Sequence, residues 1–175
     1  MKRHLIGTLL FLFGVAFVVI FLSITNWLPQ VLQEGSMKRY GTIEEMREKL
    51  KIRDLHVPAY IPQNLSWPPT EIMAQTRPYV AVVLEFRNER QGEALLVITQ
   101  SVSADFPPSE KIRIRPVKER LSYKLREKDA LLETGECGGT GICSRVEWRE
   151  GPYHMRVSMR STPAEVIRIA ESMIR

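Results

Sequence analysis

An unbroken apolar stretch, Leu5–Leu28, constrains this chain more than any other feature. It runs for 24 residues, LIGTLLFLFGVAFVVIFLSITNWL, without a charged side chain. As an α-helix it would be about 36 Å long, enough to cross the roughly 30 Å hydrocarbon core of a bilayer. No face of the stretch is polar, so it does not fit a helix that lies half-buried on a globular domain. The stretch therefore predicts a single transmembrane helix.

The same stretch fits a retained anchor better than a cleaved signal peptide. Lys2 and Arg3 supply the basic start of a leader, but the apolar region of a leader is only about 7–15 residues long. Trp27 at the far end suits the headgroup layer. Because basic residues favour the cytoplasmic side, we predict a cytoplasmic head and anchor in residues 1–33 and an extracytoplasmic domain in residues 34–175, held at the cell membrane.

The exported part is the right size for one domain, and its charge is mild. Without Lys2 and Arg3 the chain has 23 basic and 20 acidic residues, a net charge of +3. A nucleic-acid-binding domain is usually far more basic, so nucleic acid is not an expected partner. A domain of this kind beside a membrane instead favours a protein partner in the envelope.

The apolar patterns of the exported part predict an α+β domain. Thr42 and Glu45 form a capping box at the start of one helix, and Pro163 opens a second helix with apolar residues at helical spacing. Runs rich in β-branched and aromatic residues predict strands between them. These are 79–86, 94–101, 111–115, 130–134, 144–148 and 153–159. We expect an antiparallel sheet packed on one side by the helices.

Two segments of the exported part resemble a known family. The first is Val146–Tyr153 (VEWREGPY) followed by Ile169–Met173 (IAESM), and the second is Thr42–Pro62, a helix followed by VPAYIP. The pattern resembles a bacterial extracytoplasmic domain of unknown function found at the C-terminus of anti-sigma-type and sporulation membrane proteins. The resemblance implies a sheet-and-helix fold similar to that of lipoprotein carriers and no catalytic residues. Only Met1–His4 precede the anchor, so a signal received outside is expected to need a partner to relay it.

Cys137 and Cys143 are the only cysteines, and they flank a glycine-rich loop. In an oxidising compartment an even cysteine count in such a loop predicts a disulfide that staples two strands. A redox-active pair is disfavoured because the spacing is not Cys-x-x-Cys. A zinc site would need further ligands, for which only His56 and His154 are at hand, so we expect neither a metal nor a cofactor.

A second candidate site is a basic run between Lys111 and Lys128. It has eight basic residues against Glu119 and Glu127. Such a run fits anionic lipid headgroups, a cell-wall polymer or an acidic partner, but also an ordinary solvated surface. The members of this candidate basic patch are Lys111, Arg113, Arg115, Lys118, Arg120, Lys124, Arg126 and Lys128.

The sequence contains no catalytic motif. There is no Gly-x-Ser-x-Gly elbow and no His-Glu-x-x-His, so we expect a protein that is not an enzyme. The preferred hypothesis is a membrane-anchored extracytoplasmic binding or sensing module that acts through protein contacts. The alternative is a carrier-like module that holds a lipid or other apolar ligand between sheet and helix. Tyr60, Trp67 and Trp148 could line such a groove, although aromatic side chains more often fill a core.

Overall fold

The computed structural model describes residues 14, 16, 17, 21, 37–88, 92–107, 109–138 and 141–174. The chain divides into two compact units at Met37–Lys38, and the fold below is that of the second unit, Lys38–Arg175. The predicted membrane span, Leu5–Leu28, lies outside the described residues apart from four isolated positions. Within the described part of the chain, no helix is long and apolar enough to cross a membrane.

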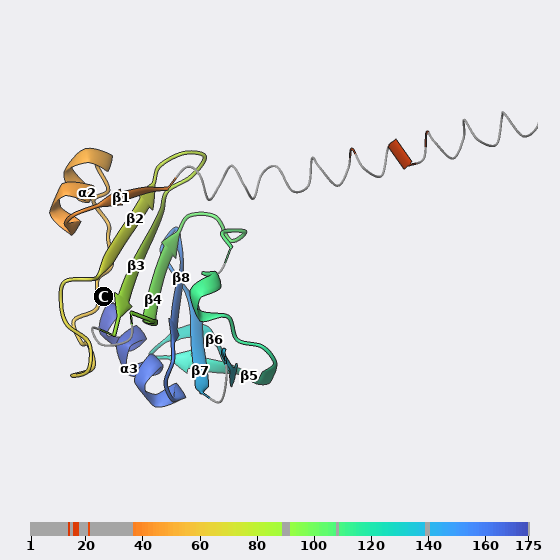
Figure 1. The fold of residues 1–175 in the computed structure, drawn as a ribbon. Helices are drawn as coiled ribbons and strands as arrows, with labels where there is room; N and C mark the ends of the chain where they lie inside the picture. Colours follow the sequence, from red (N-terminus) through yellow and green to blue (C-terminus); the bar gives the residue numbers. More distant parts are fainter. Residues whose placement is uncertain are drawn as a thin grey trace, which may run out of the picture. The chain divides into compact units, whose positions relative to one another are not determined.

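One eight-stranded antiparallel sheet forms the framework of the second unit (Figure 1). Its spatial order is β1-β2-β3-β4-β8-β7-β6-β5, so two four-stranded meanders meet where β4 pairs with β8. The strands are β1 (Lys38–Tyr40), β2 (Glu71–Gln75), β3 (Ala81–Arg87), β4 (Ala94–Ser101), β5 (Val117–Leu125), β6 (Lys128–Glu136), β7 (Ile142–Glu150) and β8 (Tyr153–Met159). The short β1 and the long β5 are the two edges of the sheet.

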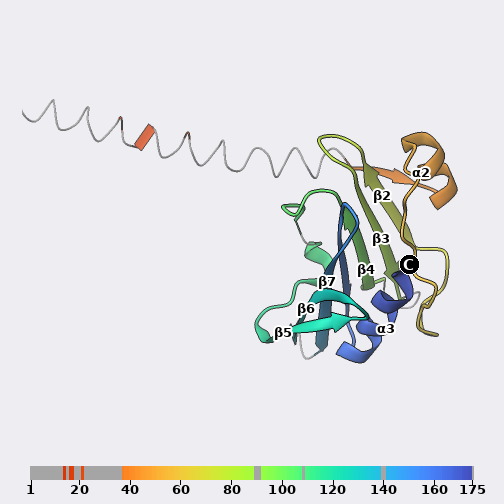
Figure 2. The same ribbon diagram turned by 180° about the vertical axis from the view of Figure 1, so that it is seen from behind.

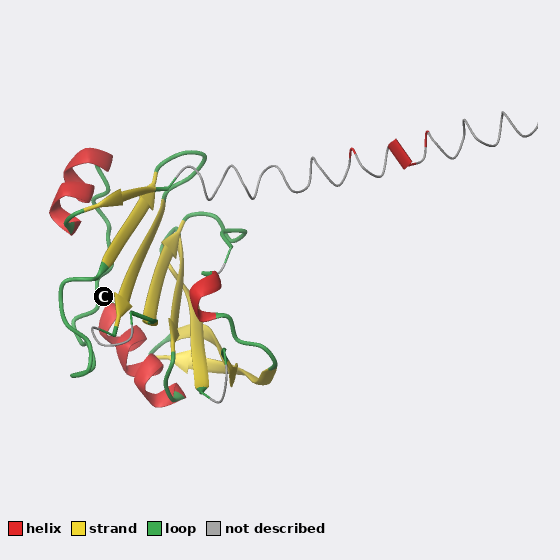
Figure 3. Ribbon diagram, viewed as in Figure 1, coloured by secondary structure: helices red, strands yellow, loops and turns green. Residues whose placement is uncertain are grey.

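Three short helices accompany the sheet (Figure 3). Helix α2 (Ile43–Leu50) starts with the predicted capping box: Thr42 Oγ1 accepts from the Glu45 amide at 3.0 Å, and Glu45 Oε2 accepts from the Gly41 amide at 2.9 Å. Helix α3 (Pro163–Met173) has proline in its first turn, as predicted, but its N-cap residue Thr162 makes no side-chain capping bond. A 3₁₀ turn, η1 (Glu110–Ile112), lies between β4 and β5.

Apolar residues on one face of the sheet form the main core with α2 and α3. One row of directly paired residues crosses six strands, and every member is buried: Ile72, Leu84, Ile98, Val157, Val146 and Leu132. From α3, Val166, Ile169 and Ala170 pack into this core with no exposed surface. The fold class is therefore α+β and mostly sheet, as expected.

The opposite face of the sheet is partly covered by the connection from β4 to β5. Figures 1 and 2 show η1 on one face of the sheet and α3 on the other. Phe106, Ile112 and Ile114 from this connection are 8%, 1% and 5% exposed. The prediction that helices cover only one side of the sheet is therefore incomplete, because a loop covers part of the second face.

The predicted strands agree with the structure at five places and differ at the edges. The runs at 79–86, 94–101, 130–134, 144–148 and 153–159 lie in or overlap β3, β4, β6, β7 and β8. The predicted strand at 111–115 is wrong, because Lys111 and Ile112 lie in η1 and the next residues are irregular. Strands β1, β2 and β5 were not expected from the sequence.

Candidate binding surface

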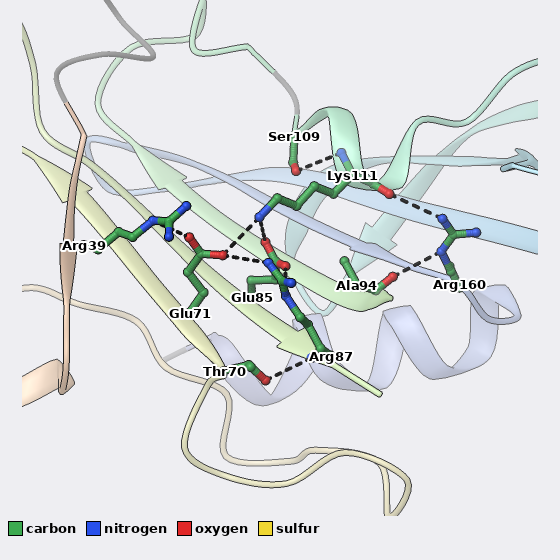
Figure 4. Close-up of polar contacts among 9 residues, drawn as sticks. All are labelled: Arg39, Thr70, Glu71, Glu85, Arg87, Ala94, Ser109, Lys111 and Arg160. Carbon is green, nitrogen blue, oxygen red and sulfur yellow. Dashed lines mark hydrogen bonds and ion pairs between the residues drawn. The ribbon is translucent and has the colours of Figure 1, made fainter. Parts of the chain in front are cut away.

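A cluster of charged side chains lies on the sheet face opposite α3 (Figure 4). Glu85 of β3 has no exposed surface, and its carboxylate contacts Arg87 Nε at 2.7 Å and Lys111 Nζ at 2.6 Å. Glu71 of β2 contacts the same two cations at 2.9 and 3.1 Å and Arg39 Nε at 2.8 Å. The cluster therefore ties β1, β2 and β3 to η1, which is a structural role.

Burial raises the pKa of Glu71, but Lys111, Arg39 and Arg87 outweigh this effect and leave the pKa below its usual value. A carboxylate that stays ionised in this way holds its cations more firmly. Lys111, whose side chain is 39% exposed, is therefore already paired with two carboxylates and is not a free member of the candidate basic patch.

Arg160, after β8, links this cluster to the cysteine loop. Its Nε donates to Ala94 O at 3.1 Å and its Nη1 donates to Cys137 O at 3.1 Å. Its Nη2 donates to Lys111 O at 3.5 Å (Figure 4). Nothing in the sequence around Arg160 signals this role, because its partners come from three distant segments.

A second buried carboxylate, Glu133 of β6, lies in the same row of cross-strand neighbours as Glu85. Arg120 of β5 and Arg145 of β7 are its direct neighbours in the register, and both guanidinium groups donate to its carboxylate. Burial raises the pKa of Glu133, but the hydrogen bonds and charge of Arg145 and Arg120 lower it below the usual value overall. The side chain of Glu133 is only 2% exposed, so this ion pair is largely shielded from water.

The structure places the members of the candidate basic patch in different surroundings. Five of its eight side chains contact carboxylates on neighbouring elements: Lys111 with Glu71 and Glu85, Lys118 with Glu136, Arg120 with Glu133, Lys124 with Asp129, and Lys128 with Glu150. Arg126 Nη1 donates to Ile174 O at 3.3 Å, and Arg113 and Arg115 are exposed in the loop before β5. The eight residues are therefore not one uniform basic surface.

The open edge at β5 is the most exposed part of the sheet. Val117 to Ser122 are all exposed, including Leu121 at 46%. Leu121 pairs with Leu132 of β6 and thus continues the buried apolar row to the edge of the sheet. Ile142, at the start of β7 and separated from β5 by β6, is 59% exposed. An exposed strand edge with apolar side chains is a typical template for pairing with another chain.

The two cysteines lie at the distance expected of a disulfide. The Cα atoms of Cys137 and Cys143 are 5.8 Å apart, and both residues are buried. Gly138 has φ +54°, a backbone conformation that residues other than glycine rarely adopt. The loop joins β6 to β7, so the pair connects two adjacent strands as expected.

The zinc alternative gains no geometric support. His56 is buried, and its backbone amide donates to Gln100 Oε1 at 2.9 Å. His154 lies near the start of β8, far along the ladder from Cys143. Among the residues that the structure describes, no group of three or more His, Cys, Asp or Glu side chains could hold a metal ion.

The three aromatic residues considered for a groove have different surroundings. Trp148 is buried in the main core. Tyr60 lies under the guanidinium of Arg168, 3.9 Å from its ring centroid. Trp67 is 50% exposed and packs against Phe86 with ring centroids 6.2 Å apart. The structure therefore does not bring the three together.

Comparison of this chain with protein-family models, curated proteins and solved structures finds no match in any of the three. The resemblance to an extracytoplasmic domain of sporulation and anti-sigma-type proteins stays a prediction.

Proposed function

We propose that this protein is a membrane-anchored extracytoplasmic module that binds a protein partner without catalysis. We further propose that the partner adds an extended segment to the open edge of β5. The single observation that supports this proposal is the long, exposed edge strand Val117–Leu125 at the end of the sheet. Strand addition supplies main-chain hydrogen bonds for affinity, and alternate side chains supply specificity.

The side chains of β5 favour an acidic segment with alternating apolar residues. One face of the strand presents Arg120 and Lys124, whose side chains are 63% and 67% exposed although each contacts a carboxylate of β6. The other face presents Leu121 and Tyr123, which continue the core side of the sheet. Carboxylates opposite the cations and an apolar residue opposite Leu121 would form favourable cross-strand pairs.

The same charges disfavour a second copy of this chain as the occupant. In an antiparallel pair centred on Ser122, Arg120 of one copy would lie opposite Lys124 of the other. Like charges directly opposite each other destabilise a strand pair. The register irregularity between Val117 and Glu119 also makes β5 a poor match for itself.

The anchor and the compartment belong to the same proposal. Leu5–Leu28 supplies an apolar length suited to a bilayer, and Cys137 and Cys143 at disulfide distance fit an oxidising compartment. The carrier alternative is not favoured, because Val166, Ile169 and Ala170 fill the layer between α3 and the sheet. A lipid there would have to displace these side chains.

Site-specific photo-crosslinking in intact cells tests the proposed edge. A photoreactive amino acid replaces Leu121 on β5 or, as a control, Val102, which is 42% exposed in the β4–β5 connection. We expect a discrete adduct with a second protein from position 121 only. Adding Lys124→Glu should abolish this adduct, whereas Arg53→Glu, with the same change in charge in the exposed segment after α2, should not.

Equal adducts from positions 121 and 102 would reject β5 as the binding edge. An adduct from position 121 that resists Lys124→Glu would reject the acidic character of the partner. An adduct of a size that fits two copies of this chain would reject the argument against self-pairing.

A further inference from the structure

A pocket of about 320 Å³ lies on the sheet face opposite α3, at the ends of β4, β8 and β7. Its floor is formed by polar side chains of these three strands, and its wall by Ser103, Ala104 and Phe106 of the β4–β5 connection. The volume is at the lower end of the range for small-molecule pockets, about 300–1,000 Å³. The strands that form it are inside the sheet, so the pocket is separate from the β5 edge.

The strand register explains why polar side chains gather here. Ser101, His154 and Arg149 are directly paired across β4, β8 and β7. Two residues further along, Thr99, Arg156 and Glu147 form the next row on the same face. Neighbouring strands are about 4.8 Å apart, so these six side chains converge within the reach of one small ligand.

Arg156 is held in place before any ligand arrives. Its Nε donates to Glu147 Oε1 at 2.6 Å and its Nη1 donates to Phe106 O at 3.3 Å. Its side chain is only 18% exposed. A guanidinium fixed in this way presents its remaining N–H groups at a defined position, which lowers the cost of ordering it on binding.

Arg149 is the cation of the pocket whose charge is not matched. Its only hydrogen bond among the described residues runs from Nε to Gly151 O at 3.3 Å, and no described carboxylate pairs with it. Glu147, the one carboxylate of the lining, is already shared between Arg156 and Arg145. The ring of His154 also has no hydrogen-bond partner in the described part of the chain, so the pocket has a surplus of donors and positive charge.

We infer that this pocket binds a small anion that carries a carboxylate or a phosphate group, with Arg149 and Arg156 as the charged contacts. Guanidinium groups bind both kinds of anion through paired N–H donors. The Thr99 hydroxyl adds a donor from the floor, and Phe106 offers apolar contact to the rest of the molecule. The inference goes beyond the proposed partner binding at β5 and does not depend on it.

Equilibrium dialysis of the full-length chain in mild detergent tests this inference, with radiolabelled inorganic phosphate or succinate at constant ionic strength. We expect saturable binding of at least one of the two anions at one site per chain. Arg149→Gln should weaken it about tenfold, the effect of losing one charge-assisted hydrogen bond. Arg149→Lys, which keeps the charge, should lose less, and Arg53→Gln should have no effect.

Each possible result decides the inference. Binding of phosphate alone or of succinate alone supports it and names the anion class. No saturable binding of either anion overturns it, as does an affinity that Arg149→Gln leaves unchanged or that Arg53→Gln lowers equally. Because Arg149 is exposed and, within the described residues, bonds only to Gly151, its variants should melt at the wild-type temperature, which circular dichroism verifies.

Discussion

The buried ion pair around Glu133 permits a quantitative prediction about stability. The substitution Glu133→Gln preserves the shape of the side chain and removes its charge. The carboxylate now accepts from Arg120 and Arg145, but an amide would turn its NH₂ group toward one of these two donors. The variant therefore loses a charge-assisted hydrogen bond and leaves a cation without its partner.

The exposure of the two arginines sets the size of the effect. Removing one partner of a fully buried ion pair costs about 3–5 kcal/mol, because the other charge stays buried. Here the side chain of Arg120 is 63% exposed and returns to water, and Arg145 keeps Glu147 at 3.4 Å. We therefore expect a loss of about 2–3 kcal/mol in the free energy of unfolding, which corresponds to about 6–9 °C in Tm for a domain of this size.

Circular dichroism melts of the full-length chain in mild detergent at pH 7 measure this loss. The control is Lys124→Gln, which breaks the pair with Asp129, whose side chains are 67% and 91% exposed. Exposed pairs contribute little, so the control should melt within about 2 °C of the wild type. A Glu133→Gln variant that melts with the control would refute the assigned role of the buried pair.

Three further predictions concern acid, the cysteine pair and one glycine. The folded state holds the pKa values of Glu71 and Glu133 below their usual range, so their stabilisation is present above the unfolded value of about 4.3 and is lost as the pH falls through the folded values. Tm should therefore be steady from pH 7 to 5 and drop in stronger acid, and Glu133→Gln should show a smaller drop. Cys143→Ser should cost about 2 kcal/mol in urea unfolding, since the closed loop is short, and an unchanged midpoint would argue against the disulfide. Gly135→Ala should lower the free energy of unfolding by about 1–3 kcal/mol, because a Cβ there would collide with the backbone oxygen of Pro116. Gly141→Ala, where nothing lies within 4 Å of the added Cβ, should leave the Tm unchanged.

The helices and the central strands of this domain could be predicted because their signals are local. The capping box of Thr42 and Glu45 and the apolar stripe after Pro163 are complete within one turn or two. The strands that were predicted have buried faces and therefore apolar runs. Strand β5 was missed for the opposite reason. It is an exposed edge strand, VKERLSYKL, and has few apolar residues.

The alternation of isoleucine and basic residues in 111–115 predicted a strand that the structure does not contain. Ile112 and Ile114 are both buried. However, Ile112 belongs to η1 and Ile114 to the loop that covers the second face of the sheet. A single pair of buried residues cannot distinguish a strand from these conformations, because only longer runs separate helical from extended periods.

The polar surfaces could not be predicted from the sequence because they depend on register. The pocket forms only because Ser101, His154 and Arg149 become neighbours across three strands. Likewise, the candidate basic patch looks uniform along the chain, yet most of its members meet carboxylates on other strands. Charge read along a sequence overestimates a patch when its partners come from distant segments.

The central claim is that a membrane-held domain faces the oxidising side of the membrane and offers β5 to a partner. The most direct test is labelling of a Ser122→Cys variant in intact cells with a membrane-impermeant maleimide, because Ser122 is exposed on that edge. The account predicts that Ser122→Cys is labelled before lysis, while the wild type, with Cys137 and Cys143 joined, is not labelled even after lysis. Labelling of the variant only after lysis, together with labelling of the wild-type cysteines, would contradict it.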